Sequence, residues 1–81
     1  MKIQEAVASD PEILGGTLCF RGTRVPVRNL FDYLEGGQSI DYFLSAFDWV
    51  SREKVIAVLD HSADLLDQMR ASAAYIENPV G

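Results

Sequence analysis

The sequence has one cysteine and one histidine, Cys19 and His61. A single cysteine cannot form an intrachain disulfide or a cysteine-based zinc site. The histidine has no serine or cysteine at a spacing that indicates a catalytic triad. Asp60 and Asp64 lie near His61, but two acids beside one histidine on a helix are typical of a solvated surface. We therefore expect no enzyme, no bound metal and no cofactor.

Long apolar runs and positive charges are also scarce. No run of about 18 apolar residues is present, so we expect no membrane-spanning helix. The first residues, Met1–Glu5, lack the apolar core of a signal peptide, which together with the lone cysteine favours the cytoplasm. The formal net charge is −5. This balance disfavours bulk electrostatic binding to nucleic acid, because such binding depends on cations that neutralise phosphates.

The charges that are present lie unevenly along the chain. The segment Thr17–Asn29 carries three arginines and no acid, a local charge of +3. From Asp60 onward, four acids face one arginine, a local charge of −3. A basic end and an acidic end suggest two different partners, although ordinary solvation of a surface explains such charges equally well.

The length of 81 residues predicts one small domain. A domain of this size buries only about 60–65% of the surface that its unfolded chain exposes. The hydrophobic fraction of 48% is that of a folded protein. Because so small a core is marginally stable, we expect a homodimer or a bound partner to contribute to stability.

Turn residues predict a short hairpin near the N-terminus. Residues 2–8 are mixed in character and could form a strand, and Asp10-Pro11 begins a turn. Residues 17–20 and 25–27 are short apolar strands, and Gly22 between them supplies the positive φ that a tight hairpin turn requires.

Three helices are expected to follow the hairpin. The first covers residues 27–35 and ends at Gly36-Gly37. The second is capped by Ser39, and the third is capped by Ser51 and runs to about Ile76. The expected fold is therefore α+β and mostly α: a short N-terminal β-hairpin on a three-helix, homeodomain-like helix-turn-helix bundle with a long C-terminal helix.

The second and third helices, joined by Asp48–Val50, have the order of a helix-turn-helix. The apolar residues expected to fix the angle between the two helices are Ile40, Leu44, Val50, Val55 and Leu59. In such DNA readers the first residues of the second helix contact base edges. Glu53 would repel phosphate there, and a helical hairpin that only packs explains the pattern equally well.

The arginines of the hairpin offer a second surface for nucleic acid. A two-stranded ribbon can contact DNA, but these arginines could instead pin the hairpin to the body. The acids available for such pairing are Asp10, Glu12 and Asp32. The residues expected to contact DNA on either surface are Arg21, Arg24, Arg28, Ser51, Arg52 and Lys54.

The third helix carries the most regular apolar pattern in the chain. Its apolar seam, spaced alternately by four and three residues, consists of Val55, Leu59, Ser62, Leu66, Met69, Ala73 and Ile76. Beyond Leu66 little chain is left to cover this seam, so a second chain should cover it. We divide the chain into a domain, residues 1–66, and a partner-binding helical arm with a loose tail, residues 67–81.

An acidic ridge accompanies the seam on the same helix and suits a basic partner. The residues expected to contact a partner protein are Leu66, Met69, Ala73, Ile76, Asp60, Asp64 and Asp67. A surface helix with solvated acids is the alternative.

The segment Ser9–Val27 resembles the signature of domain-of-unknown-function family 433. The signature combines an Asp-Pro-x-x-x-Gly-Gly segment with Arg-Gly-Thr-Arg and an apolar-Pro-Val step. The matching residues are Asp10, Pro11, Gly15, Gly16, Arg21, Gly22, Thr23, Arg24, Pro26 and Val27. With the helices that follow, the resemblance covers about Val7 to Leu66.

Members of this family are similar to VapB-type antitoxins. The resemblance implies a homodimer that binds and neutralises a PIN-like ribonuclease toxin and represses its own operon by binding operator DNA. A DNA-binding regulator without a toxin and a purely structural dimerisation module are the alternatives.

Overall fold

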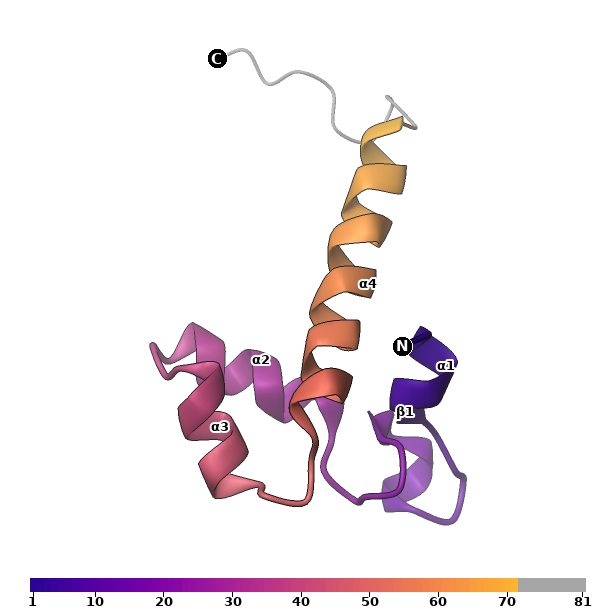
Figure 1. Cartoon of the computed structure of the whole chain (residues 1–81). Coiled ribbons are helices and arrows are strands. Elements are labelled where there is room, and N and C mark those ends of the chain that lie inside the picture. The colour runs from indigo at the N-terminus through magenta and orange to yellow at the C-terminus, as the bar shows by residue number, and fades with distance from the viewer. Residues whose placement is uncertain (72–81) are drawn as a thin grey trace.

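The computed structural model describes residues 1–71, and these residues form a mostly helical α+β domain. Its elements, in chain order, are α1 (Ile3–Ala6), β1 (Val7–Ala8), the 3₁₀ turn η1 (Leu14–Gly16), β2 (Cys19–Phe20), α2 (Val27–Glu35), α3 (Ile40–Ala46) and α4 (Arg52–Ala71). Figure 1 shows α4 rising out of a body that the other elements form around its base. The predicted fold class is confirmed.

The N-terminal segment differs from the expected strand, because a helical turn precedes the strand. In α1 the Glu5 carboxylate accepts a hydrogen bond from the Lys2 backbone N–H at 2.8 Å, which satisfies a donor that a helix start leaves free. Only Val7 and Ala8 are extended. Ala6 is fully buried, and α1 packs beside α4. The long helix thus has an N-terminal neighbour that the sequence pattern did not predict.

The predicted hairpin forms its turn, but its second strand is reduced to a single bridge. Gly22 has the expected positive φ, +83°. The regular partner of β2 is β1, antiparallel, with Val7 opposite Phe20. On the other side of β2, Cys19 forms an isolated bridge with Pro26. The Phe20 N–H donates to the Val25 carbonyl and the Val27 N–H donates to the Leu18 carbonyl, both at 3.0 Å, so this bridge forms without an N–H from Pro26. The ladder ends there because α2 begins at Val27.

The first long helix has the bounds that the sequence predicts, residues 27–35. Its end is a Schellman motif: the Gly37 N–H donates to the Leu34 carbonyl at 3.0 Å, and the Gln38 N–H donates to the Tyr33 carbonyl at 2.9 Å. Gly37 has a φ of +88°, a conformation that L side chains rarely adopt. The helix therefore ends where its glycine permits a left-handed residue.

Replacement of Gly37 by alanine is expected to lower the free energy of unfolding by about 1 kcal/mol, because an L residue is strained at positive φ. Urea denaturation followed by circular dichroism measures the change. Gly36→Ala is the matched control, since Gly36 has a φ of −80° and an added Cβ would lie 3.4 Å from the Asp32 carbonyl oxygen, an ordinary contact. Equal losses in the two variants would contradict this role of Gly37.

The two serine caps are confirmed. Ser39 Oγ accepts from the Tyr42 N–H at 3.0 Å, and Ser51 Oγ accepts from the Lys54 N–H at 3.2 Å. The helix that Ser51 begins is described through Ala71, so the expected end near Ile76 lies outside the described residues. Although α4 has 20 residues, no helix within residues 1–71 is apolar enough to cross a membrane.

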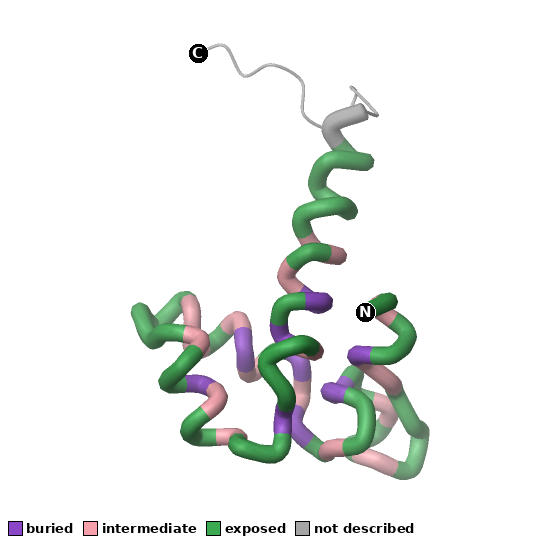
Figure 2. The backbone as a smooth tube through the Cα atoms, viewed as in Figure 1, coloured by how far each residue is buried: buried purple, intermediate pink, exposed green. Residues whose placement is uncertain are grey.

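One apolar core joins the body to the lower half of α4. Its buried members are Phe20, Val25, Val27, Leu30, Phe43, Val50, Val55 and Val58. Ile40, Leu44 and Leu59 pack against them while partly buried, as the helix-turn-helix order predicts. Figure 2 shows the buried residues of α4 confined to its lower part and the upper part exposed. The body covers one half of the long helix and leaves the other half bare.

Candidate binding surfaces

Arg21 fastens the N-terminal segment to the turn after β2. Its Nε donates to the Gln4 carbonyl at 2.9 Å, and its Nη2 donates to the Val7 carbonyl at 3.3 Å. The carbonyls at the end of a short helix have no partner within the helix. The sequence allowed Arg21 to hold the hairpin to the body through an ion pair with an acid. Arg21 does link the two segments, but its partners are backbone carbonyls rather than acids.

Substitution of Arg21 by methionine, which keeps the chain length but no donor, is expected to cost about 1–2 kcal/mol of unfolding free energy. The loss reflects two hydrogen bonds from a charged donor. Arg28→Met serves as control, because the Arg28 side chain is 76% exposed and its ion pair with Asp32 is on the surface. Chemical denaturation of both variants makes the comparison. A loss no larger in Arg21→Met than in the control would show that these hydrogen bonds do not hold α1.

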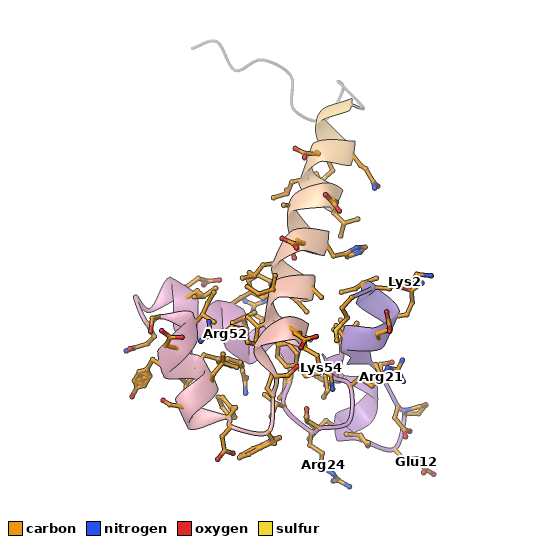
Figure 3. The ribbon with its side chains drawn as sticks, viewed as in Figure 1. Lys2, Glu12, Arg21, Arg24, Arg52 and Lys54 are labelled. Carbon is orange, nitrogen blue, oxygen red and sulfur yellow. The ribbon has the colours of Figure 1, made fainter. Side chains whose placement is uncertain are left out.

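Lys54 and Arg28 also contact other groups of the same chain. Lys54 Nζ donates to the Arg21 carbonyl at 2.6 Å, which ties the start of α4 to the turn after β2. Arg28 Nε lies 3.2 Å from Asp32 Oδ1, one turn along α2. Figure 3 shows Lys54 and Arg21 close together beside the base of α4. Binding DNA through these groups would require them to leave partners that they already have.

The start of α4 is engaged in the same way. The Arg52 guanidinium forms an ion pair and a hydrogen bond with the Asp41 carboxylate of α3. Ser51 Oγ is occupied as the helix cap. Three residues that the helix-turn-helix pattern nominates for DNA contact, Ser51, Arg52 and Lys54, therefore also serve the fold.

Arg24 is different from the other predicted basic residues. Within residues 1–71 its side chain has no ion pair and no hydrogen bond, and it does not pair with Asp10, Glu12 or Asp32. Figure 3 shows it pointing away from the body. Of the six residues predicted to contact DNA, Arg24 is the one whose side chain the described fold does not use.

Arg24 lines an open hollow of about 600 Å³. The hollow lies between the segment around η1, the turn after β2 and the connection from α3 to α4. Its lining residues are Ala8, Asp10, Ile13, Thr17, Cys19, Phe20, Arg21, Gly22, Thr23, Arg24 and Trp49. Asp10 and the Arg-Gly-Thr-Arg segment, which are apart in the sequence, thus meet around one concave surface.

Trp49 is the member of this surface that sequence reasoning missed. It lies in the connection between α3 and α4, and its side chain is 59% exposed with one edge packed on Phe47, the ring centroids 6.0 Å apart. The sequence did contain a signal for it, because a large apolar side chain is unusual in a short connection between two helices and can indicate a binding surface. Only the folded chain brings it to the hollow that Arg24 also lines.

The second candidate surface is the upper half of α4. Leu66 is 60% exposed, Leu65 47% and Met69 37%. These three residues continue the face that Val55 and Leu59 bury in the body. The predicted seam residues Ala73 and Ile76 lie outside the described residues. α4 passes through Leu66 without a break, so the predicted domain and arm share one continuous helix.

The acidic ridge does not share a face with the seam. Asp60 and Met69 are nine residues apart in the sequence, which is about two and a half helical turns, so they point in opposite directions. Asp64 and Leu66 are separated by roughly 160° around the helix axis. Asp60, Asp64 and Asp67 are all exposed. A single flat partner therefore contacts either the seam or the ridge, because the helix itself separates them.

No group of three or more His, Cys, Asp or Glu side chains among residues 1–71 is placed to hold a metal ion. His61 is half-buried on α4, and Cys19 is buried and free in β2. Cys19 therefore packs as a small apolar side chain in the described fold.

The profile of a family described as "Protein of unknown function (DUF433)" matches residues 7–61. A relative from Sinorhizobium fredii (strain NBRC 101917 / NGR234), "Uncharacterized protein y4eO", is 42% identical over 52 residues, covering 64% of this chain. The chain spans about a quarter, 24%, of the length of that curated relative. A crystal structure of a DUF433 member from Anabaena variabilis aligns with a TM-score of 0.66 over 89% of this chain and 71% of that one, at 24% identity, which shows a shared fold. Because the family profile matches residues 7–61, which are well over half of the 81 residues of this chain, the chain belongs to the DUF433 family.

Proposed function

We propose that the chain is a non-enzymatic antitoxin of a type II toxin-antitoxin pair, acting in the cytoplasm, which binds and neutralises a PIN-like ribonuclease toxin. The resemblance to VapB-type antitoxins supports the proposal, and so does the upper half of α4. The observation that carries it is the exposed apolar face of Leu65, Leu66 and Met69 above the body.

This face is placed for a helix-in-groove interaction. An amphipathic helix binds a groove through apolar residues spaced by three and four positions, and Leu66 and Met69 follow that spacing. The acids on the opposite side of α4 would remain in solvent and keep the outer face polar. A partner that covered this face would bury side chains that the body of the domain leaves exposed.

The test compares the full chain with a variant that ends at Leu66, both tagged and expressed in the native host. We expect a small metal-dependent ribonuclease to co-elute with the full chain and to be inhibited by it in an RNA-cleavage assay. The truncated chain should remain folded, because the core lies below Leu66, and should lose the nuclease. Retention of the nuclease by the truncated chain would overturn the arm as the binding element. Recovery of a stable homodimer with no nuclease would favour the structural dimerisation module instead.

We also propose operator binding by a homodimer as a second function, which would let the chain repress its own operon. The order α3, connection and capped α4 supports it. The internal contacts of Arg21, Arg28, Arg52 and Lys54 make it the weaker candidate. Binding to the chain's own promoter should weaken with salt and with Arg24→Ala. No shift of the promoter fragment at low salt, with the nuclease present, would remove this function.

A further inference from the structure

The polar side chains around the Ser9–Val27 segment divide sharply by what they contact. The Asp10 carboxylate accepts from the Glu12 N–H at 2.9 Å and so shapes its own turn. Thr23 Oγ1 donates to the Phe20 carbonyl at 2.8 Å and accepts from the Val25 N–H at 3.0 Å. The polar atoms of Asp10 and Thr23 therefore make hydrogen bonds within their own turns.

Arg24 stands out against this background, because it borders the hollow with no partner among residues 1–71. The exposed Trp49 side chain lines the same hollow, as do Ile13, Cys19 and Phe20. Tryptophan and arginine are among the residues in which energetic hot spots at protein interfaces are enriched, and they become desolvated when a partner covers them. The hollow offers an apolar surface and one uncommitted cation; its lining also contains the Asp10 carboxylate, which is hydrogen-bonded in its own turn, and Arg21, which is bonded to backbone carbonyls.

We propose that this hollow is a docking site for a carboxylate-bearing segment of a partner protein, with Arg24 as its anchor. The segment's Asp or Glu accepts a bidentate hydrogen bond from the Arg24 guanidinium, and an adjacent apolar side chain lies against Trp49. The proposal rests on the antitoxin function in one respect, that the partner is a protein. It adds a contact on the body of the domain, separate from the arm on α4.

The number of uncommitted cations around the hollow favours a single carboxylate as the ligand over a nucleic acid. A DNA-binding surface gains affinity from several phosphate contacts, about 6–10 in strong binders. Around this hollow one arginine is uncommitted, while Arg21 is bonded to Gln4 and Val7. A single phosphate contact gives little affinity in salt, whereas one bidentate arginine–carboxylate pair beside an apolar floor is sufficient for a protein hot spot.

The experiment uses the full chain, whose single tryptophan, Trp49, reports directly on the hollow by fluorescence. The probes are short capped peptides with a central Glu or Asp between apolar residues, each paired with its Gln or Asn counterpart. A short oligothymidylate and inorganic phosphate are tested beside them. The variants are Arg24→Ala, Arg24→Lys and, as control, Arg28→Ala, whose arginine does not line the hollow.

We expect acidic peptides to bind about tenfold more tightly than their amide counterparts. Arg24→Ala should abolish that difference, Arg24→Lys should keep part of it, and Arg28→Ala should leave it unchanged. Equal affinity for acidic and amide peptides, indifference to Arg24→Ala, or no fluorescence response to any peptide would overturn the proposal. A response to oligothymidylate without one to the acidic peptides would assign the hollow to nucleic acid, and a response to inorganic phosphate alone would assign it to a small anion; either result would overturn the proposal. The arm plays no part in these measurements, so their failure is distinguishable from failure of the truncation test.

Discussion

Replacement of Phe43 by alanine is expected to remove about 3–5 kcal/mol of unfolding free energy, the range for a buried phenylalanine. Phe43 is fully buried, and its ring lies 5.9 Å from that of Phe20, 5.5 Å from that of Tyr33 and 5.0 Å from that of Phe47. It therefore connects β2, α2 and the end of α3. The total free energy of unfolding of a domain of this length is roughly 4–12 kcal/mol. The variant should therefore be partly or wholly unfolded at room temperature.

The control is the adjacent residue on the same helix. Tyr42 is 49% exposed and touches one ring, that of Tyr33, with centroids 6.0 Å apart. Tyr42→Ala should cost about 1 kcal/mol or less. Urea midpoints and thermal melts of both variants, with Phe43→Leu as an intermediate, give the comparison. Similar losses in Tyr42→Ala and Phe43→Ala would mean that the aromatic cluster is not the centre of the core.

Exchange of Leu66 and Met69 together for glutamine is expected to weaken binding of the partner nuclease by about 100-fold, or nearly 3 kcal/mol. Each apolar side chain is worth about 1.5–3 kcal/mol when fully buried, and these two begin partly exposed. The same exposure means that the free chain should lose little stability. Isothermal titration calorimetry with the purified nuclease measures the affinity, and circular dichroism checks the fold.

The matched variant carries Asp60→Asn and Asp64→Asn on the opposite side of α4. We expect it to change affinity by no more than a few fold and to alter mainly the salt dependence, because exposed charges are screened. The reverse pattern, with binding lost on neutralising the acids and kept on changing the seam, would place the acidic ridge at the interface. In that case the apolar face would need another explanation.

Much of the helical part of the fold was predictable because its signals are local. Ser39 and Ser51 cap the helices that they precede, and Gly37 ends α2 in the left-handed conformation that glycine permits. Hydrophobic spacing selected the side of α4 that enters the core, with Val55 fully buried. These features depend on neighbours within a few residues, so the sequence alone contains them.

The strand pairing was not predictable in the same way. Residues 25–27 are apolar and adjacent to the turn, but β2 pairs with β1, which lies farther away in the sequence. The reason is the immediate start of α2 at Val27, which leaves little extended backbone after the turn for a ladder. Arg21 then stabilises the distant pairing through the carbonyls of Gln4 and Val7.

The sequence by itself determined the three longer helices, the serine caps of two of them and an apolar stripe longer than a small domain can bury, because periodicity and capping act over a few residues. Tertiary structure alone decided which cations pair with distant segments, since Arg21, Arg52 and Lys54 find partners elsewhere among residues 1–71 and Arg24 does not. It also brought Trp49 to the hollow beside Arg24. Side-chain pairing between distant segments depends on how the chain packs, and no local pattern contains that information.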